Sequence, residues 1–252
     1  MFSNLAKSFL FLLCMTSTAM SSVTITGTRI IFPGNSKDEV VRLNNKDKSS
    51  PALVQVWIDD GIKVNDINNK DIPFVVTPPV SRIEPLKGQS IRLIYNGMAL
   101  PQDKESIFYF NMLEIPPEGK DDAQQRLDIA FKTRIKLFYR PAGLMKSGSV
   151  NEEGKLVIEQ VDNAQKGTGI KVTNPTAYYF TFSEMKVSIN GKSVELNADM
   201  VAPGTSGEFY AGKPQSGSIS EINYTFLNDY GSPHTGKMVK GAGAGFTSVK
   251  VK

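Results

Sequence analysis

Residues 126–139 read RLDIAFKTRIKLFY, and apolar residues alternate with charged ones along this stretch. The odd positions are apolar or aromatic except Thr133, and the even positions are charged except Ala130 and Phe138. Because a strand places successive side chains on opposite faces, this alternation predicts one long strand with one apolar face. At about 3.3 Å per residue the strand would extend about 46 Å, which exceeds a typical strand.

The length of this predicted strand leaves two interpretations open. It can be an ordinary core strand with a frayed end, or a strand whose apolar edge stays exposed for pairing with another chain. The polar segment 116–125 (PPEGKDDAQQ) precedes it, so we expect the Leu127 end to be the exposed one. Exposed apolar edges promote aggregation, and a protein that keeps one is expected to have a partner that covers it.

The rest of the chain has the pattern of an all-β protein. Short segments rich in Val, Ile, Phe and Tyr are separated by turn residues and predict strands at 23–31, 53–58, 90–95, 107–113, 156–161, 170–173, 178–181, 185–189, 193–196, 208–210 and 219–226. Asn190-Gly191 lies between two of them and predicts a type I′ hairpin. No amphipathic helix of ordinary length is apparent, so we expect β-sandwiches.

The segment Arg140-Pro141-Ala142-Gly143 marks a break between two halves of the chain. Proline ends a strand and glycine loosens the backbone, so a hinge is expected here. We expect a signal peptide over residues 1–21, one domain over 22–143 and a second over 144–252. The first 21 residues contain Lys7, then an apolar run, then small residues, which is the order of an export signal.

The composition argues against most enzyme chemistries. The chain has one histidine, His234, and one cysteine, Cys14, which lies inside the expected signal peptide. This leaves the mature chain without a plausible zinc ligand set or a disulfide. The paired acids Asp59-Asp60 and Glu152-Glu153 flank expected turns, and we interpret them as solvated loop charges. The net charge of +4 forms no basic stripe, so nucleic-acid binding is not expected.

Seven motifs follow one another along the chain: TRII at 28–31, VTPP at 76–79, ESIFYFN at 105–111, EIPP at 114–117, IKLFYRP at 135–141, TNPT at 173–176 and NDYG at 228–231. In this order, and over nearly the whole expected mature chain, they resemble the periplasmic pilus chaperones of the chaperone–usher pathway. The resemblance implies an all-β fold of two immunoglobulin-like β-sandwich domains set at an angle, with an inter-domain cleft.

The resemblance also implies a binding site for a fibre subunit. Arg29 and Lys136 would hold the C-terminal carboxylate of the subunit, a task suited to charge-assisted hydrogen bonds. Leu127, Ile129 and Phe131 would enter a groove in the subunit, which lacks its last strand and borrows one from the chaperone. The alternation places Lys136 on the opposite face of this strand, so the anchor and the donor side chains would use its two faces.

Other matched residues have structural roles in the family. Glu105, Arg140 and Asp229 correspond to an inter-domain salt-bridge network at the hinge. The family places a cis proline near Thr77-Pro78, and the sequence leaves open whether Pro78 or Pro79 is the cis residue.

The implied function is a non-enzymatic periplasmic chaperone that stabilises pilus (fimbrial) subunits and delivers them to an outer-membrane usher. It implies no cofactor, metal, nucleic acid or membrane insertion. The alternative is a fibre subunit or an adhesive, sugar-binding β-sandwich protein. A fibre subunit would carry an alternating extension at its mature N-terminus, whereas we interpret residues 23–31 as the first strand of a domain. Self-association of the free protein is left open.

Overall fold

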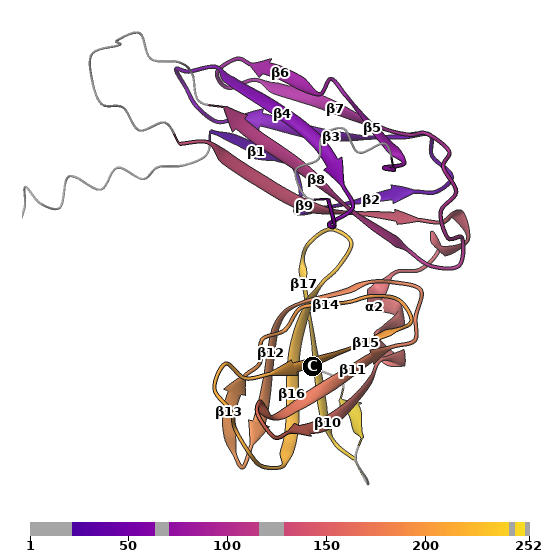
Figure 1. Ribbon diagram of the computed structural model, residues 1–252, viewed down its shortest axis with the longest axis vertical. Coiled ribbons are helices and arrows are strands. Elements are labelled where there is room, and N and C mark those ends of the chain that lie inside the picture. Colours follow the sequence, from indigo (N-terminus) through magenta and orange to yellow (C-terminus); the bar gives the residue numbers. More distant parts are fainter. Residues whose placement is uncertain (1–21, 64–70, 116–128, 242–244, 250–252) are drawn as a thin grey trace, which may run out of the picture.

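The computed structural model describes residues 22–63, 71–115, 129–241 and 245–249. Within them the chain forms two β-sandwiches that follow one another along the long axis of the molecule (Figure 1). No helix in these ranges is long and apolar enough to cross a membrane. The expected signal peptide, residues 1–21, lies outside the described residues.

The first sandwich packs a four-stranded sheet on a five-stranded sheet. The smaller sheet has the order β1 (Val23–Ile25), β3 (Asp38–Asn45), β7 (Gly88–Tyr95), β5 (Phe74–Thr77). The larger has the order β2 (Arg29–Pro33), β9 (Phe131–Arg140), β8 (Ser106–Ile115), β4 (Ala52–Asp59), β6 (Val80–Ile83). Alternate side chains of both sheets point inward, and Phe32, Leu43 and Phe110 are fully buried between them.

The second sandwich packs the sheet β10 (Val157–Asn163), β11 (Gly167–Asn174), β15 (Thr205–Tyr210) on a larger one. The larger sheet has the order β13 (Lys192–Glu195), β12 (Phe180–Ile189), β16 (Ile219–Leu227), β17 (Pro233–Lys240), β18 (Phe246–Val249), and β14 (Met200–Val201) also pairs with β12. Asn190 and Gly191 join β12 to β13 with φ angles of 50° and 78°, which confirms the predicted hairpin. Phe180, Ile222 and Phe226 are central to a separate core.

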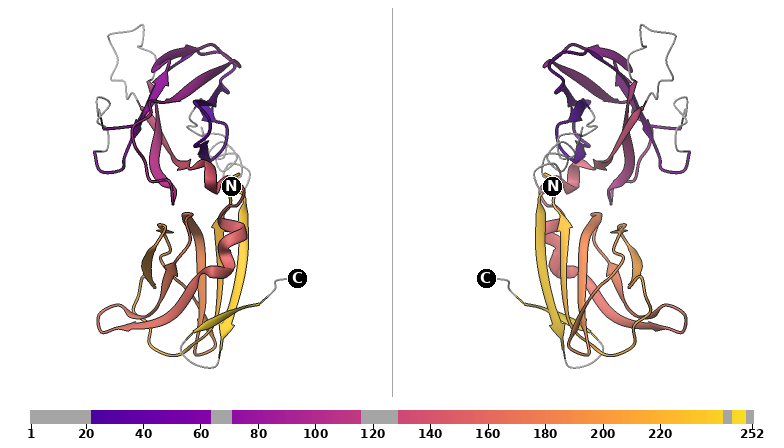
Figure 2. Two further views of the ribbon diagram at one scale, coloured as in Figure 1. Left: turned by 90° about the vertical axis from the view of Figure 1, so that its right-hand side faces the viewer. Right: turned by 90° about the vertical axis from the view of Figure 1, so that its left-hand side faces the viewer.

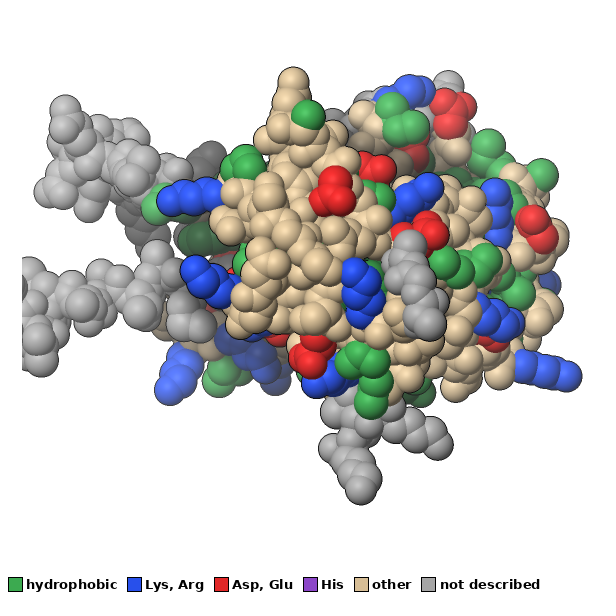
Figure 3. Space-filling view, turned by 90° about the horizontal axis from the view of Figure 1, so that it is seen from below, with side chains coloured by type: hydrophobic (Ala, Val, Ile, Leu, Met, Phe, Trp, Pro, Cys, Tyr) green, Lys and Arg blue, Asp and Glu red, His purple; other side chains and the backbone are tan. Residues whose placement is uncertain are grey.

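A short linker joins the sandwiches. It contains the 3₁₀ turns Ala142–Leu144 and Glu153–Lys155 on either side of the four-residue helix α2 (Ser149–Glu152), and both views in Figure 2 place it at the waist of the molecule. Seen from below, the second sandwich carries interspersed acidic and basic side chains rather than a continuous field of one sign (Figure 3).

Four of the predicted strand segments were wrong in extent. The segment 23–31 is two strands, because Gly27 has a φ of 91° and the chain passes from the smaller sheet, at β1, to the larger, at β2. The segments 178–181 and 185–189 belong largely to one bulged strand, β12. The strand expected at 126–139 does not include residues 129 and 130: β9 begins at Phe131, which pairs with Glu114 near the end of β8, and residues 126–128 lie outside the described residues.

Two acids that we interpreted as solvated loop charges are instead bound by neighbouring side chains. Asp59 is the last residue of β4 and is fully buried, where Asn111 and Arg134 satisfy its carboxylate. Glu153 is half-buried; its carboxylate accepts a 2.7 Å hydrogen bond from Tyr224 Oη and lies 2.8 Å from His234 Nε2. Asp59 ends β4 and Glu153 begins the 3₁₀ turn Glu153–Lys155, so position next to a turn did not imply exposure.

Candidate functional site

The two edges of β9 are occupied to different extents. On one side, antiparallel β8 pairs with β9 from Phe131 to Tyr139. On the other side, β2 runs parallel to β9 but pairs only with residues 136–140. The edge of β9 from Phe131 to Ile135 therefore faces no strand among the described residues. Such an edge presents backbone donors and acceptors that another chain can use.

Arg29 and Lys136 lie side by side at the point where this open edge begins. Arg29 is the first residue of β2 and is the register partner of Lys136. Arg29 Nη1 donates a 2.9 Å hydrogen bond to the carbonyl of Leu227 in the second sandwich. Lys136 Nζ lies 3.4 Å from Thr181 Oγ1, also in the second sandwich. Both cations therefore reach into the cleft between the two domains.

The charges of these two residues are poorly compensated. Burial lowers the pKa of Arg29, and the charges of Asp229 and Glu105 only partly oppose this effect. Burial also lowers the pKa of Lys136; the charge of Asp199 only partly opposes this decrease, and the nearby Arg29 adds to it. The Nε of Arg29 is buried and has no hydrogen-bond partner among the described residues. An anion that enters the cleft would relieve both costs.

The predicted donor side chains lie at the far end of this edge. Ile129 precedes β9 and is 51% exposed, and Phe131, the first residue of the strand, is half-buried. Leu127 lies outside the described residues. Further along, Ile135 and Leu137 pack in the core of the first sandwich, whereas Lys136 between them reaches the cleft. The apolar face of β9 thus runs from the core toward exposed residues.

The cleft-facing side of β9 carries two more cations that sequence reasoning missed. Arg134 stacks 3.8 Å from the ring centre of Tyr109 and binds Asp59 Oδ1 at 2.5 Å. Lys132 lies 5.0 Å from the ring centre of Trp57. The alternation of charges at even positions was the available signal, but it did not identify their aromatic and acidic partners on β8 and β4.

The structure brings the three predicted hinge residues together. Arg140 Nε binds Glu105 at 2.7 Å, and its two terminal nitrogens bind the carboxylate of Asp229 at 2.6 and 2.7 Å. Asp229 lies on the β16–β17 turn, which projects toward the first sandwich (Figure 1). Burial opposes the charge of Arg140, but the hydrogen bonds and charges of the two acids outweigh it and raise its pKa. One guanidinium therefore ties both sandwiches together.

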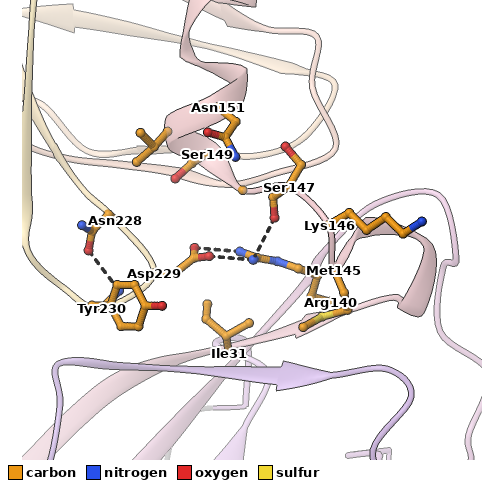
Figure 4. A pocket seen from close by; sticks show the side chains of 12 residues that line it. Ile31, Arg140, Met145, Lys146, Ser147, Ser149, Asn151, Asn228, Asp229 and Tyr230 are labelled. Carbon is orange, nitrogen blue, oxygen red and sulfur yellow. Dashed lines mark hydrogen bonds and ion pairs between the residues drawn. The ribbon is translucent and has the colours of Figure 1, made fainter.

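This ion cluster borders a cavity of about 510 Å³ at the hinge. Figure 4 shows Arg140 and Asp229 pointing toward one another, with the carbonyl of Ser147 accepting from the same guanidinium at 3.3 Å. On the other side, Glu105 also accepts a 2.8 Å hydrogen bond from the backbone of Tyr179. Because most of its donors already bind Glu105, Asp229 and Ser147, Arg140 is suited to hold the domains in place rather than to bind a ligand.

Other chemistry finds no support in the described part of the chain. His234, on β17, pairs with Glu153 of the linker. No cluster of three or more potential metal-ligating His, Cys, Asp or Glu residues occurs among the described residues. The Thr77–Pro78 bond is the cis peptide, which resolves the choice that the sequence left open.

These features define a class of protein: a two-domain β-sandwich with a cationic cleft beside a half-open strand edge. The chain matches the family model described as "Pili and flagellar-assembly chaperone, PapD N-terminal domain" over residues 22–145. It matches "Pili assembly chaperone PapD, C-terminal domain" over residues 153–238. The chain belongs to the pili assembly chaperone family.

Individual relatives agree with this assignment. The chain is 38% identical over 231 residues to the probable fimbrial chaperone YadV of Escherichia coli strain K12, which covers 88% of this chain and 92% of that protein. It is 38% identical over 238 residues to the chaperone protein HifB of Haemophilus influenzae, with 92% of each covered. The crystal structure of the Pseudomonas aeruginosa CupB2 chaperone is 32% identical, with a TM-score of 0.71, and covers 86% of this chain and 100% of that one.

Proposed function

We propose that the protein is a periplasmic chaperone that captures pilus (fimbrial) subunits along the open edge of β9 and delivers them to an outer-membrane usher. In this proposal residues 1–21 are the export signal, 22–143 the first domain and 144–252 the second. Fibre subunits and sugar-binding sandwiches are the alternative, but the family matches cover both domains and are to chaperones.

One observation carries the proposal: strand β2, which pairs with one edge of β9, begins at Arg29, opposite Lys136, and leaves the edge beside residues 131–135 unpaired among the described residues. A guest strand that pairs with β9 beside residues 131–135 would have one end next to these two cations. If it runs parallel to β9, as β2 does, its C-terminal carboxylate meets them. If it runs antiparallel, its N-terminal ammonium meets them. Electrostatics therefore favours a parallel guest strand that ends at the cleft.

The donor side chains supply the apolar part of this proposal. Transfer of Ile129 and Phe131 into a groove of the guest would contribute about 1.5–3 kcal/mol each, before association costs. Leu127 would add a third side chain if the alternation continues through it. Hydrogen bonds along β9 would add affinity, because the guest strand extends the sheet of the chaperone.

The cationic pair also sets the register of the guest strand. A slip of one residue turns every side chain to the other face, so a fixed end is needed to align the apolar faces. Arg29 and Lys136 would fix that end by binding the terminal carboxylate, a group that every guest chain carries whatever its sequence.

The test is co-expression of the tagged protein with the secreted proteins encoded next to its gene, followed by mass spectrometry of what co-purifies. We expect a stable complex with a single fibre subunit, and no complex with a variant of that subunit from which its own C-terminal strand has been removed. Capture of the truncated subunit at the level of the intact one would contradict the proposal.

A further inference from the structure

Asp199 belongs to the second domain, and its charge acts on Lys136 of the first domain. It directly precedes β14, in which Met200 is the register partner of Thr181, and Thr181 is the residue that Lys136 contacts. The exposed carboxylate of Asp199 accepts a 2.7 Å hydrogen bond from the backbone N–H of Met200. This bond holds the acid at the start of β14, on the rim of the cleft.

The charge of Asp199 acts on two residues of the first domain that are themselves register partners, Tyr109 and Lys136. Burial raises the pKa of Tyr109, and the charge of Asp199 adds to the increase. Burial lowers the pKa of Lys136, and Asp199 opposes that decrease. The acid therefore faces this pair without forming an ion pair with Lys136.

The acids near Arg29 are in a different situation. Asp229 and Glu105 act on Arg29, but both carboxylates bind Arg140 directly. Asp199 has no ion pair among those found between described residues, so its charge is not committed elsewhere. On the Lys136 side of the cleft it is the acid whose charge partly opposes the effect of burial on the ammonium in the free protein.

We infer that Asp199 is a built-in competitor for the subunit carboxylate, which weakens capture at Lys136 and thereby eases release of the subunit. This inference rests on the proposed function. Two carboxylates beside one ammonium repel each other, so the subunit terminus binds against the charge of Asp199. Asp199 stabilises the charged form of Lys136 in the free protein and destabilises the complex with the subunit carboxylate.

The experiment measures how tightly the protein binds a synthetic peptide with the sequence of the C-terminal strand of the co-purified subunit. The peptide ends either in a free carboxylate or in an amide. Asp199→Asn should bind the carboxylate peptide about two- to fivefold more tightly than the unmodified protein, as expected for one charge acting at a partly exposed site. It should bind the amide peptide unchanged. The gain should shrink in high salt.

Two variants serve as controls. Asp199→Glu retains the charge and should bind like the unmodified protein. Glu195→Gln removes an exposed acid from β13 in the same domain and should leave the affinity unchanged. Equal or weaker binding of the carboxylate peptide by Asp199→Asn, or an equal gain in Glu195→Gln, would overturn the inference. If the unmodified protein binds carboxylate and amide peptides equally, the proposed anchor fails instead.

Discussion

Arg29 and Lys136 are register partners on the parallel strands β2 and β9, and the pairing of β2 with β9 begins at these two residues. The two residues are far apart in the sequence, and each extends into the cleft toward the second domain. The end of one strand therefore coincides with a concentration of positive charge. A guest strand on the open edge of β9 is therefore favoured in one orientation, with its C-terminus at these two cations.

Removal of either anchor charge should abolish capture of a subunit. In Lys136→Ala and Arg29→Ala we expect loss of the co-purified subunit with a melting temperature close to that of the unmodified protein, because burial already disfavours both charges. Lys192→Ala, at an exposed site on β13, is the matched control and should capture normally. Wild-type yields of complex from the folded anchor variants would contradict the anchor role.

Polar substitution of the exposed donor residue should affect binding more than folding. Ile129→Ser should weaken capture and change the free energy of unfolding by less than about 1 kcal/mol, because the side chain is largely exposed. Leu137→Ser, on the buried part of the same segment, should instead lose several kcal/mol of stability. Thermal and denaturant unfolding separate the two effects, and a large stability loss in Ile129→Ser would indicate a core residue.

The hinge cluster should contribute strongly to stability. Arg140→Ala leaves the buried carboxylate of Glu105 without its cation, which should cost about 3–5 kcal/mol in denaturant unfolding. Arg82→Ala removes one partner of an exposed pair with Glu84 and should cost less than about 1 kcal/mol. Similar small losses in both variants would show that the hinge pair is not a major contact.

Capture should weaken at alkaline pH. Burial holds the pKa of Lys136 below its ordinary value of 10.5, so its ammonium is lost at a lower pH than in an exposed lysine. Carboxylate binding needs the charged form and should fall as the pH rises through this lowered pKa. The stability of the free protein changes in the opposite sense, since the folded state disfavours that charge and gains as the pH rises toward 10.5.

Peptide affinity measured from roughly neutral pH to pH 10 checks this dependence. Lys136→Arg keeps a charge over the whole range, so any peptide binding that it retains should vary little with pH. A flat profile in the unmodified protein would show that the ammonium of Lys136 does not contact the ligand.

The sequence predicted the two-sandwich fold because alternation within short segments is a local signal. It failed where a strand changes sheets: nothing between Val23 and Ile31 except Gly27 indicated that two different sheets share this segment. It overestimated β9 because Ile129 continues the alternation but has no strand partner among the described residues. A strand forms only where a neighbouring strand pairs with it, and the tertiary fold, not the local alternation of residues, decides where that neighbour lies.

The candidate site was predicted less completely. The positions of Arg29 and Lys136 came from the resemblance to pilus chaperones, since no local pattern distinguishes them from surface charges. The opposite orientation of Lys136 and the apolar residues around it followed from alternation alone and agrees with their contacts. Asp59 and Asp199 were missed as partners of the cleft, because each meets its cationic neighbour only through strand pairing distant in sequence.

Amide hydrogen exchange along β9, in the free protein and in its complex with a subunit, tests most directly whether a guest strand occupies the open edge. We predict that the alternate amides between Phe131 and Ile135 that point away from β8 become protected on binding, while those of 136–140 change little. Protection confined to other surfaces, with these amides exchanging as in the free protein, would contradict the account.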